Sequence, residues 1–299
     1  MTAASLGPAA DPPVDFIASE PAPAAPRRLG RQRAVGRAIT YAVATVMALF
    51  ILVPIYLIFV SAVTPPDRVF DYPRPLIPAE ISFETINFFI NASGVQDAFW
   101  RSVTVAMITL VLSLVIGAPA GYALARYVFR GRDAYRLSVL STRAFPIVIL
   151  AIPLAVTYLR LGLFDSVWGV ALMHTALALP FTVLITSSVF ASVPRELEEA
   201  AQTLGCTPLR AFLSVSLPLA LPGLAAAAIF TWVISWNDVF AAVILTLRNP
   251  TLPAKILTAL TQSPIHYQFA AGFVMLLPSI IVIFFIRRYL LGLWGRVVK

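Results

Sequence analysis

Several residue types that build sites in soluble proteins are scarce in this chain of 299 residues. The single cysteine, Cys206, excludes an internal disulfide and a metal cluster built on cysteines. The two histidines, His174 and His266, are too few and too far apart for a histidine metal site. Charged residues make up only 12% of the chain and hydrophobic residues 59%, whereas a soluble domain has about 25% and about 45–50%. The composition indicates a membrane protein.

Catalytic motifs are also missing from the sequence. There is no glycine-rich phosphate loop of the Walker type, so the chain cannot hydrolyse ATP by itself. The apolar runs carry no paired carboxylates, no Ser/His/Asp set and no His-Glu-x-x-His pattern, which disfavours an intramembrane enzyme. We therefore predict a non-catalytic protein with no metal site and no bound cofactor.

Six apolar runs are long enough to cross a bilayer, which takes about 20 residues. They predict an all-α, polytopic membrane protein with six transmembrane helices. The predicted spans are residues 39–63, 102–127, 137–158, 167–190, 221–246 and 269–285. The net charge of +8 can attract nucleic acid, but cationic residues at the ends of spans explain it better, and we predict no nucleic-acid partner.

The distribution of Lys and Arg predicts the orientation in the membrane. With the N-terminus inside, fifteen of the 22 lie in cytoplasmic segments and six on the opposite side, with Arg143 alone in a span. This asymmetry favours both termini in the cytoplasm. Residues 1–36 are rich in Pro and Ala, contain no apolar signal-peptide segment and predict a disordered cytoplasmic tail before a transmembrane domain at 37–299.

The cytoplasmic loop at 191–220 is the longest polar segment in the second half of the chain. Pro194 suits the first position of a helix, and Gly205 can take the left-handed conformation that ends one. Thr207 followed by Pro208 is a second helix start, as N-cap and first-turn proline. The pattern predicts two short helices at the membrane surface.

One face of the first predicted helix is apolar. It is formed by Leu197, Ala200, Ala201 and Leu204, at spacings of three and four residues. An amphipathic connector between two spans would explain this face, but it does not require two adjacent alanines, a glycine and a Leu-Pro pair at fixed offsets.

Those offsets resemble the "EAA" signature of permease subunits in bacterial ATP-binding-cassette (ABC) importers. The matching residues are Glu199, Ala200, Ala201, Gly205, Leu217 and Pro218. Val215 replaces the usual Ile, and Leu204 stands where an acidic residue is usual. Weaker similarities, at 121–126, 162–165 and 235–238 among others, resemble the carbohydrate-importer branch, the type of the second permease of the maltose transporter.

The resemblance implies a multi-pass subunit of the bacterial inner membrane that forms half of a pathway for a sugar or polyol. It implies a second, usually non-identical permease, two cytoplasmic ATPase subunits that use ATP, and a periplasmic or lipid-anchored solute-binding protein. The loop at 194–218 would then be the coupling helix on the ATPase, with Glu199 offering a charge and the alanines permitting close approach.

Three polar or aromatic residues near the end of the fifth predicted span are candidates for the pathway or its gate. They are Trp236, Asn237 and Asp238, a combination that suits stacking and hydrogen bonding to a sugar. For Asp238, a structural hydrogen bond near the interface is an equally good interpretation. We predict that Arg143 reaches the headgroups and that His174 bonds across helices.

A stand-alone secondary transporter of a small polar solute is the alternative function. It predicts inverted repeats and several charges inside the spans for ion coupling. Only Arg143, His174 and Asp238 are candidates within the spans, which disfavours this alternative.

Overall fold

The computed structural model describes residues 28–69, 71–73, 76–78, 80–144, 146–260 and 263–294. Every regular element within these ranges is a helix. The chain consists of two compact units, one ending at Val53 and the other beginning at Pro54. The first helix, α1 (Arg28–Val63), crosses the boundary between them.

The part of α1 that lies in the first unit is apolar and exposed. All its side chains from Ala34 to Val53 are exposed, and the segment Ala34–Val63 is apolar and long enough to span a bilayer. Such a helix is stable in lipid, where its backbone groups are satisfied internally. Because α1 begins at Arg28, residues 28–36 are helical and not part of the predicted disordered tail. Residues 1–27 of that tail lie outside the described residues.

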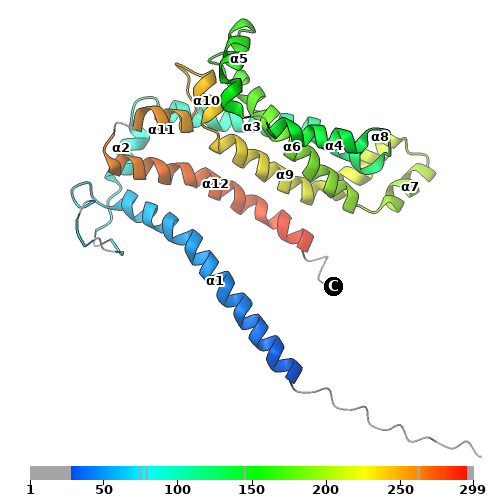
Figure 1. The fold of residues 1–299 in the computed structure, drawn as a ribbon, viewed down its shortest axis with the longest axis horizontal. Helices are drawn as coiled ribbons and strands as arrows, with labels where there is room; N and C mark the ends of the chain where they lie inside the picture. The colour runs from blue at the N-terminus through cyan, green and yellow to red at the C-terminus, as the bar shows by residue number, and fades with distance from the viewer. Residues whose placement is uncertain are drawn as a thin grey trace, which may run out of the picture. The chain divides into compact units, whose positions relative to one another are not determined.

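The second unit contains four more helices that are long and apolar enough to span a bilayer. They are α3 (Val95–Arg126), α6 (Val167–Ser192), α9 (Leu217–Asn237) and α12 (Ile265–Trp294). Figure 1 shows them running side by side as a bundle. The predicted spans at 39–63, 102–127, 167–190 and 269–285 each coincide with a helix, apart from a few residues at the ends.

The predicted span at 221–246 ends too late. Helix α9 stops at Asn237, Asp238 is extended, and a separate short helix, α10 (Phe240–Leu245), follows. The apolar pattern continues through the break, so hydropathy alone could not locate it.

The predicted span at 137–158 is not one continuous helix. It is divided into α4 (Arg132–Ser141), a 3₁₀ turn (Thr142–Ala144) and α5 (Ile147–Arg160), and the two arms are bent by 89°. Pro146 stands immediately before α5, and a proline lacks the amide hydrogen that a continuous helix needs. The described chain therefore has five candidate spans, or six if this bent pair is one span.

Two glycines allow α3 and α6 to approach closely. A Cβ atom at Gly121 would lie 2.1 Å from Thr186 Oγ1, and one at Gly117 would lie 2.8 Å from Thr182 Cγ2. Thr186 Oγ1 donates to the Gly117 carbonyl at 2.9 Å. The two glycines are four residues apart and therefore share one face, as in other small-residue contacts between membrane helices.

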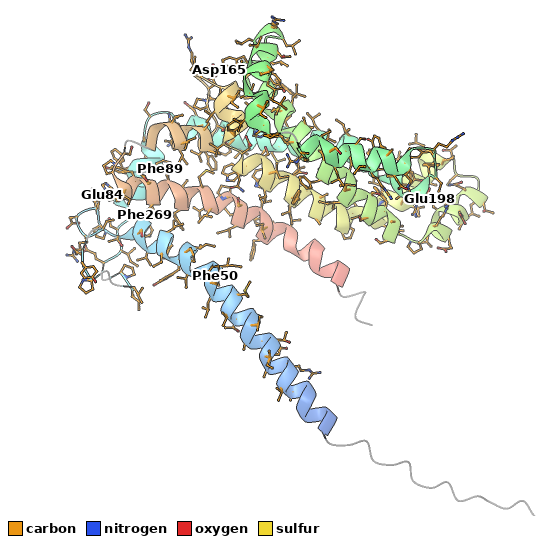
Figure 2. All side chains as sticks on the ribbon, in the orientation of Figure 1. Phe50, Glu84, Phe89, Asp165, Glu198 and Phe269 are labelled. Atoms are coloured by element: carbon orange, nitrogen blue, oxygen red, sulfur yellow. The ribbon has the colours of Figure 1, made fainter. Side chains whose placement is uncertain are left out.

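Several of the shorter helices lie at the ends of the bundle. At one end are α2 (Glu84–Asn91) and α11 (Leu252–Leu260), and at the other are α7 (Arg195–Thr203), α8 (Pro208–Ala211) and a π-helix (Phe212–Ser216). Figure 2 shows Glu84 and Glu198 at these opposite ends. By the predicted orientation, the end that carries Glu198 is cytoplasmic.

Candidate functional site

The loop between α6 and α9 folds as two short helices joined by a glycine bend. Helix α7 ends in a Schellman motif, in which Cys206 N–H donates to the Ala201 carbonyl at 3.1 Å and Gly205 N–H to the Gln202 carbonyl at 2.9 Å. Gly205 has a φ of +90°, the left-handed region predicted for it. The bend therefore has a defined geometry.

The N-termini of the two short helices differ slightly from the prediction. Thr207 is the N-cap of α8, its side chain accepts from Arg210 N–H at 3.3 Å, and Pro208 is the first helical residue, as predicted. Pro194 is the N-cap of α7 and not its first helical residue, because its ψ of 129° is extended.

Most of the predicted coupling residues lie on the surface. Glu199 is exposed and pairs with Arg195 on its own helix at 3.1 Å. Ala200 and Pro218 are exposed, while Ala201 and Leu217 are half-buried. Leu204, the last residue of the predicted apolar face, is 87% exposed. The predicted apolar face of α7 is thus largely open to a partner.

The acid that attaches α7 to the bundle is Glu198, which the sequence analysis did not single out. Its carboxylate accepts from Arg126 Nε at 3.0 Å, from Ser216 Oγ at 2.8 Å and from the Tyr122 hydroxyl. Both partners of the Arg126–Glu198 ion pair are buried, with side-chain exposures of 8% and 7%. Arg126 also donates from Nη2 to the Val193 carbonyl at 3.0 Å.

Burial alone raises the pKa of the Glu198 carboxyl. Hydrogen bonds from Tyr122 and Ser216, together with the charge of Arg126, outweigh burial and hold this pKa below its usual range. Glu198 is therefore ionised at neutral pH, and the charge is fully paired. The sequence does contain a signal for this site, since Tyr122 and Arg126 are four residues apart and share one face at the cytoplasmic end of a span.

An aromatic cluster covers this ion pair. Tyr122 packs against Phe212 and Phe190, with ring centroids 4.5 Å and 5.5 Å apart, and all three are buried. Exclusion of water strengthens the interaction between the charges and raises the cost of leaving one unpaired.

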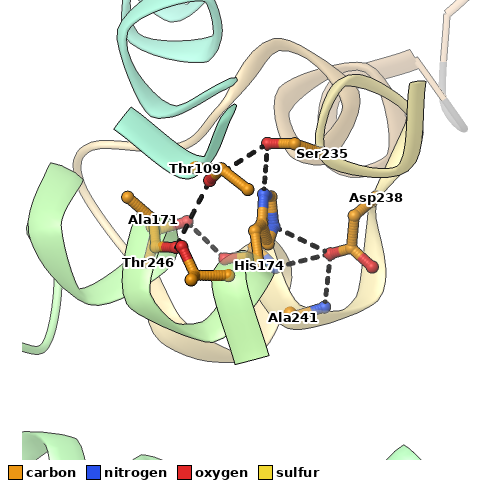
Figure 3. A network of polar contacts seen from close by, with 9 residues as sticks. Thr109, Ala171, His174, Ser235, Asp238, Ala241 and Thr246 are labelled. Atoms are coloured by element: carbon orange, nitrogen blue, oxygen red, sulfur yellow. Dashed lines mark hydrogen bonds and ion pairs between the residues drawn. The ribbon is translucent and has the colours of Figure 1, made fainter. Parts of the chain in front are cut away.

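A second polar network lies inside the bundle, and Figure 3 shows its members. His174 on α6 contacts Ser235 Oγ at 2.9 Å through Nδ1 and Asp238 Oδ2 at 3.1 Å through Nε2. Ser235 in turn donates to Thr109 of α3 at 3.4 Å. The network joins α3, α6 and α9, and the predicted hydrogen bond of His174 across helices is present.

The three predicted pathway residues have different surroundings. Trp236 is fully buried, donates to the Met275 carbonyl at 3.0 Å and stacks on Trp232. Asp238 accepts from Ala241 N–H at 2.9 Å and so caps the start of α10. Asn237 is exposed, and its side-chain amide donates to the Val233 carbonyl of its own helix at 3.0 Å.

Arg143 is exposed and lies over an aromatic ring. Its guanidinium carbon is 4.7 Å from the centroid of Phe181 on α6. This contact holds the 3₁₀ turn between α4 and α5 against α6. Among the residues that the structure describes, no group of three or more His, Cys, Asp or Glu could hold a metal ion.

Fold and site together define a class of protein: a helical, multi-pass membrane subunit with a firmly attached surface element at one end. A comparison with known protein families supports this class. The family model described as "Binding-protein-dependent transport system inner membrane component" matches residues 113–291, more than half of the chain. The chain belongs to this family of inner membrane transport components.

Individual relatives cover most of the chain. The trehalose transport system permease protein SugB of Mycobacterium tuberculosis is 33% identical over 262 residues, 85% of this chain and 95% of that protein. The diacetylchitobiose uptake system permease protein NgcG of Streptomyces coelicolor is 30% identical over 261 residues, 85% of this chain and 86% of that protein.

A solved bacterial ABC transporter involved in alginate import has a chain of the same fold. The TM-score is 0.67 at 22% identity, covering 87% of this chain and 98% of that chain. The protein is therefore a non-catalytic, multi-pass permease subunit of an inner-membrane, binding-protein-dependent ABC importer. It works with a binding protein and with ATPase subunits that hydrolyse the ATP.

Proposed function

We propose that the chain forms half of a translocation pathway for a carbohydrate and that α7 couples it to an ATPase subunit. The observation that carries the coupling role is the contrast between the two sides of α7. One side is attached to the bundle through buried Glu198, while Ala200 and Leu204 are exposed. An exposed apolar face on a fixed helix suits docking into a groove of a partner.

The carbohydrate class is supported by relatives. Proteins that are about 30% identical over most of the chain carry names for the transport of trehalose, diacetylchitobiose and alpha-glucosides. We propose that the complete importer has a second, non-identical permease, two ATPase subunits and a solute-binding protein that is periplasmic or lipid-anchored.

Within the pathway, Asn237 is the candidate for contact with the solute. Its side chain is exposed, whereas Trp236 is buried and Asp238 is engaged with His174 and the start of α10. We therefore propose that Trp236 and Asp238 hold the end of α9 in position and that Asn237 faces the pathway or its gate.

The coupling role is tested by the Ala200→Arg variant in the native complex. A long charged side chain on the exposed face prevents close approach, so we expect the ATPase subunit to be lost when the complex is purified through this chain. The matched control is Gln202→Arg, which lies on another side of α7 and is also exposed. If the Ala200→Arg complex retains the ATPase subunit, the proposed coupling role of α7 is wrong.

The substrate class is tested by uptake in cells that lack this chain. We expect loss of uptake of trehalose, of diacetylchitobiose or of an alpha-glucoside, restored by the wild-type chain, with methionine uptake unchanged as the control. Normal uptake of all three sugars would contradict the carbohydrate assignment.

A further inference from the structure

Three elements meet at the Glu198 carboxylate: α7 itself, the end of α3 with Tyr122 and Arg126, and the π-helix with Ser216. Arg126 also donates to the Val193 carbonyl in the turn before α7. α3 is also packed closely on α6 through Gly117 and Gly121. A continuous line of contacts thus leads from α7 into the middle of the bundle.

The π-helix adds a second, independent feature at the same place. It is one turn, Phe212–Ser216, inserted directly before α9. Single π-turns are rare and frequently lie at functional sites. Its first and last residues, Phe212 and Ser216, are both buried, and they contact Tyr122 and Glu198 respectively. The irregular turn places both side chains at the ion pair.

We infer that Glu198 is the positioning residue that makes α7, the end of α3 and the start of α9 move as one body. This inference rests on the proposed coupling role of α7. The exposed residues of α7 contact the ATPase, and buried Glu198 transmits their displacement to α3 and α9. Rigid transmission needs a contact with two firmly held partners, which the buried ion pair and the Ser216 hydrogen bond provide.

The two neighbouring acids, Glu198 and Glu199, then have different functions. Glu199, the acid of the signature, is exposed and belongs to the docking surface, whereas Glu198 faces the bundle. Without Glu198, the docking surface of α7 should still be present, but α7 should be loosely connected to α3 and α9. A purely stabilising role predicts instead a less stable complex whose α7 still follows α3.

The test measures the distance between α7 and the end of α3 in the complete complex in lipid nanodiscs. Spin labels are placed by Gln202→Cys and Val128→Cys, both exposed positions, after Cys206→Ser and removal of cysteines from the other subunits. Pulsed electron paramagnetic resonance is recorded without nucleotide and with ATP plus vanadate. In the wild type we expect one narrow distance distribution that is the same in both states.

The decisive variant is Glu198→Gln, which keeps the size of the side chain and removes its charge. We expect the ATPase to remain bound and the distance distribution to broaden or shift when ATP and vanadate are added. Glu198→Asp, which restores the charge, should recover part of the narrow distribution. The matched control is Glu196→Gln, an exposed glutamate on the same helix, which should behave as the wild type.

If the Glu198→Gln complex does not assemble, Ser216→Ala tests the same connection of α7 to the bundle, because it removes one hydrogen bond to Glu198. We expect Ser216→Ala to broaden the distance distribution less than Glu198→Gln would. Distributions of Glu198→Gln, or of Ser216→Ala in its place, that match the wild type in both states would overturn the inference. Retention of the ATPase by Ala200→Arg, by contrast, overturns the coupling role and says nothing against the internal link.

Discussion

Asp238 shows how one carboxylate can organise two helices inside a membrane protein. Its Oδ2 atom contacts His174 Nε2 at 3.1 Å and accepts from two amides in the first turn of α10, those of Ala241 and Ala242. The capped helix is only six residues long and follows directly after α9 ends. The carboxylate therefore replaces hydrogen bonds that the backbone loses at the break.

The first prediction concerns the pair Asp238 and Asn237. Asp238→Ala leaves His174 and the α10 amides without their acceptor, which costs about 1–3 kcal/mol for a buried polar group. We expect a lower apparent melting temperature of the complex in detergent. Asn237→Ala removes only a bond within α9 and should leave the melting temperature unchanged while reducing sugar uptake. An unchanged melting temperature for Asp238→Ala, with a lower one for Asn237→Ala, would show that Asp238 is not the structural residue of the pair.

The second prediction concerns Asp165, on the face predicted to be external. Its Oδ1 atom accepts from the amides of Leu247, Arg248 and Asn249 at 2.9–3.1 Å, and its φ is +58°. Burial raises the pKa of this carboxyl, but these hydrogen bonds outweigh burial and lower the pKa below its usual value of about 3.9. The stabilisation is therefore complete above about pH 3.9 and is lost as the pH falls through the lower folded-state pKa.

The loop at 246–251 should accordingly stay closed between pH 7 and pH 5. We expect its amide hydrogen exchange, corrected for the intrinsic effect of pH, to be equally protected at both values. Asp165→Ala should remove the protection at both. Opening of the wild-type loop at pH 5, or full protection in the variant, would show that Asp165 does not hold it.

Residue types and spacing predicted the exposed face of α7, but they did not predict that Glu198 attaches α7 to the bundle. The apolar face, the left-handed Gly205 and the cap Thr207 follow from local rules, so they were predictable. Glu198 and Glu199 are adjacent acids of the same type, and only the direction of each side chain relative to α3 separates them. That direction depends on packing between segments more than 70 residues apart in sequence.

At the scale of elements, the helices with strong apolar runs were predicted and the breaks were not. α3, α6 and α12 coincide with predicted spans because a long apolar run has few other stable states in a bilayer. The end of α9 at Asn237 and the bend before α5 were missed, since the apolar pattern continues through both. Pro146 was visible in the sequence, but other prolines, such as Pro119 and Pro180, lie within continuous helices.

The third prediction concerns the contact between α3 and α6. A Cβ atom at Gly121 would lie 2.7 Å from the Ser187 backbone nitrogen as well as 2.1 Å from Thr186 Oγ1, so the helices must separate to admit one. We expect Gly121→Val to destabilise the bundle by about 1–3 kcal/mol or more. The measurement is the apparent melting temperature of the purified complex.

The matched control for that contact is Gly36→Val on α1, where an added Cβ atom meets nothing within 4 Å. It should leave the melting temperature of the bundle unchanged. Equal melting temperatures for Gly121→Val and the wild type would show that the close approach of α3 and α6 is not needed.

At the scale of the whole molecule, two kinds of observation agree on the class of protein. The sequence predicts an apolar bundle with a cytoplasmic loop, and the family model covers residues 113–291, which include that loop. The groove that we propose for α7 would belong to another subunit, so it cannot be found in this chain. Exposed Leu204 is the residue of this chain that we propose to enter it.

The most direct measurement of the coupling role is photo-crosslinking from position 204 in the assembled importer. A photoreactive amino acid replaces Leu204, and a second variant carries it in place of Asn249, at the predicted external face. We expect a crosslink to the ATPase subunit from position 204 and none from position 249. An intact complex in which position 204 crosslinks only to lipid or to its own chain would contradict it.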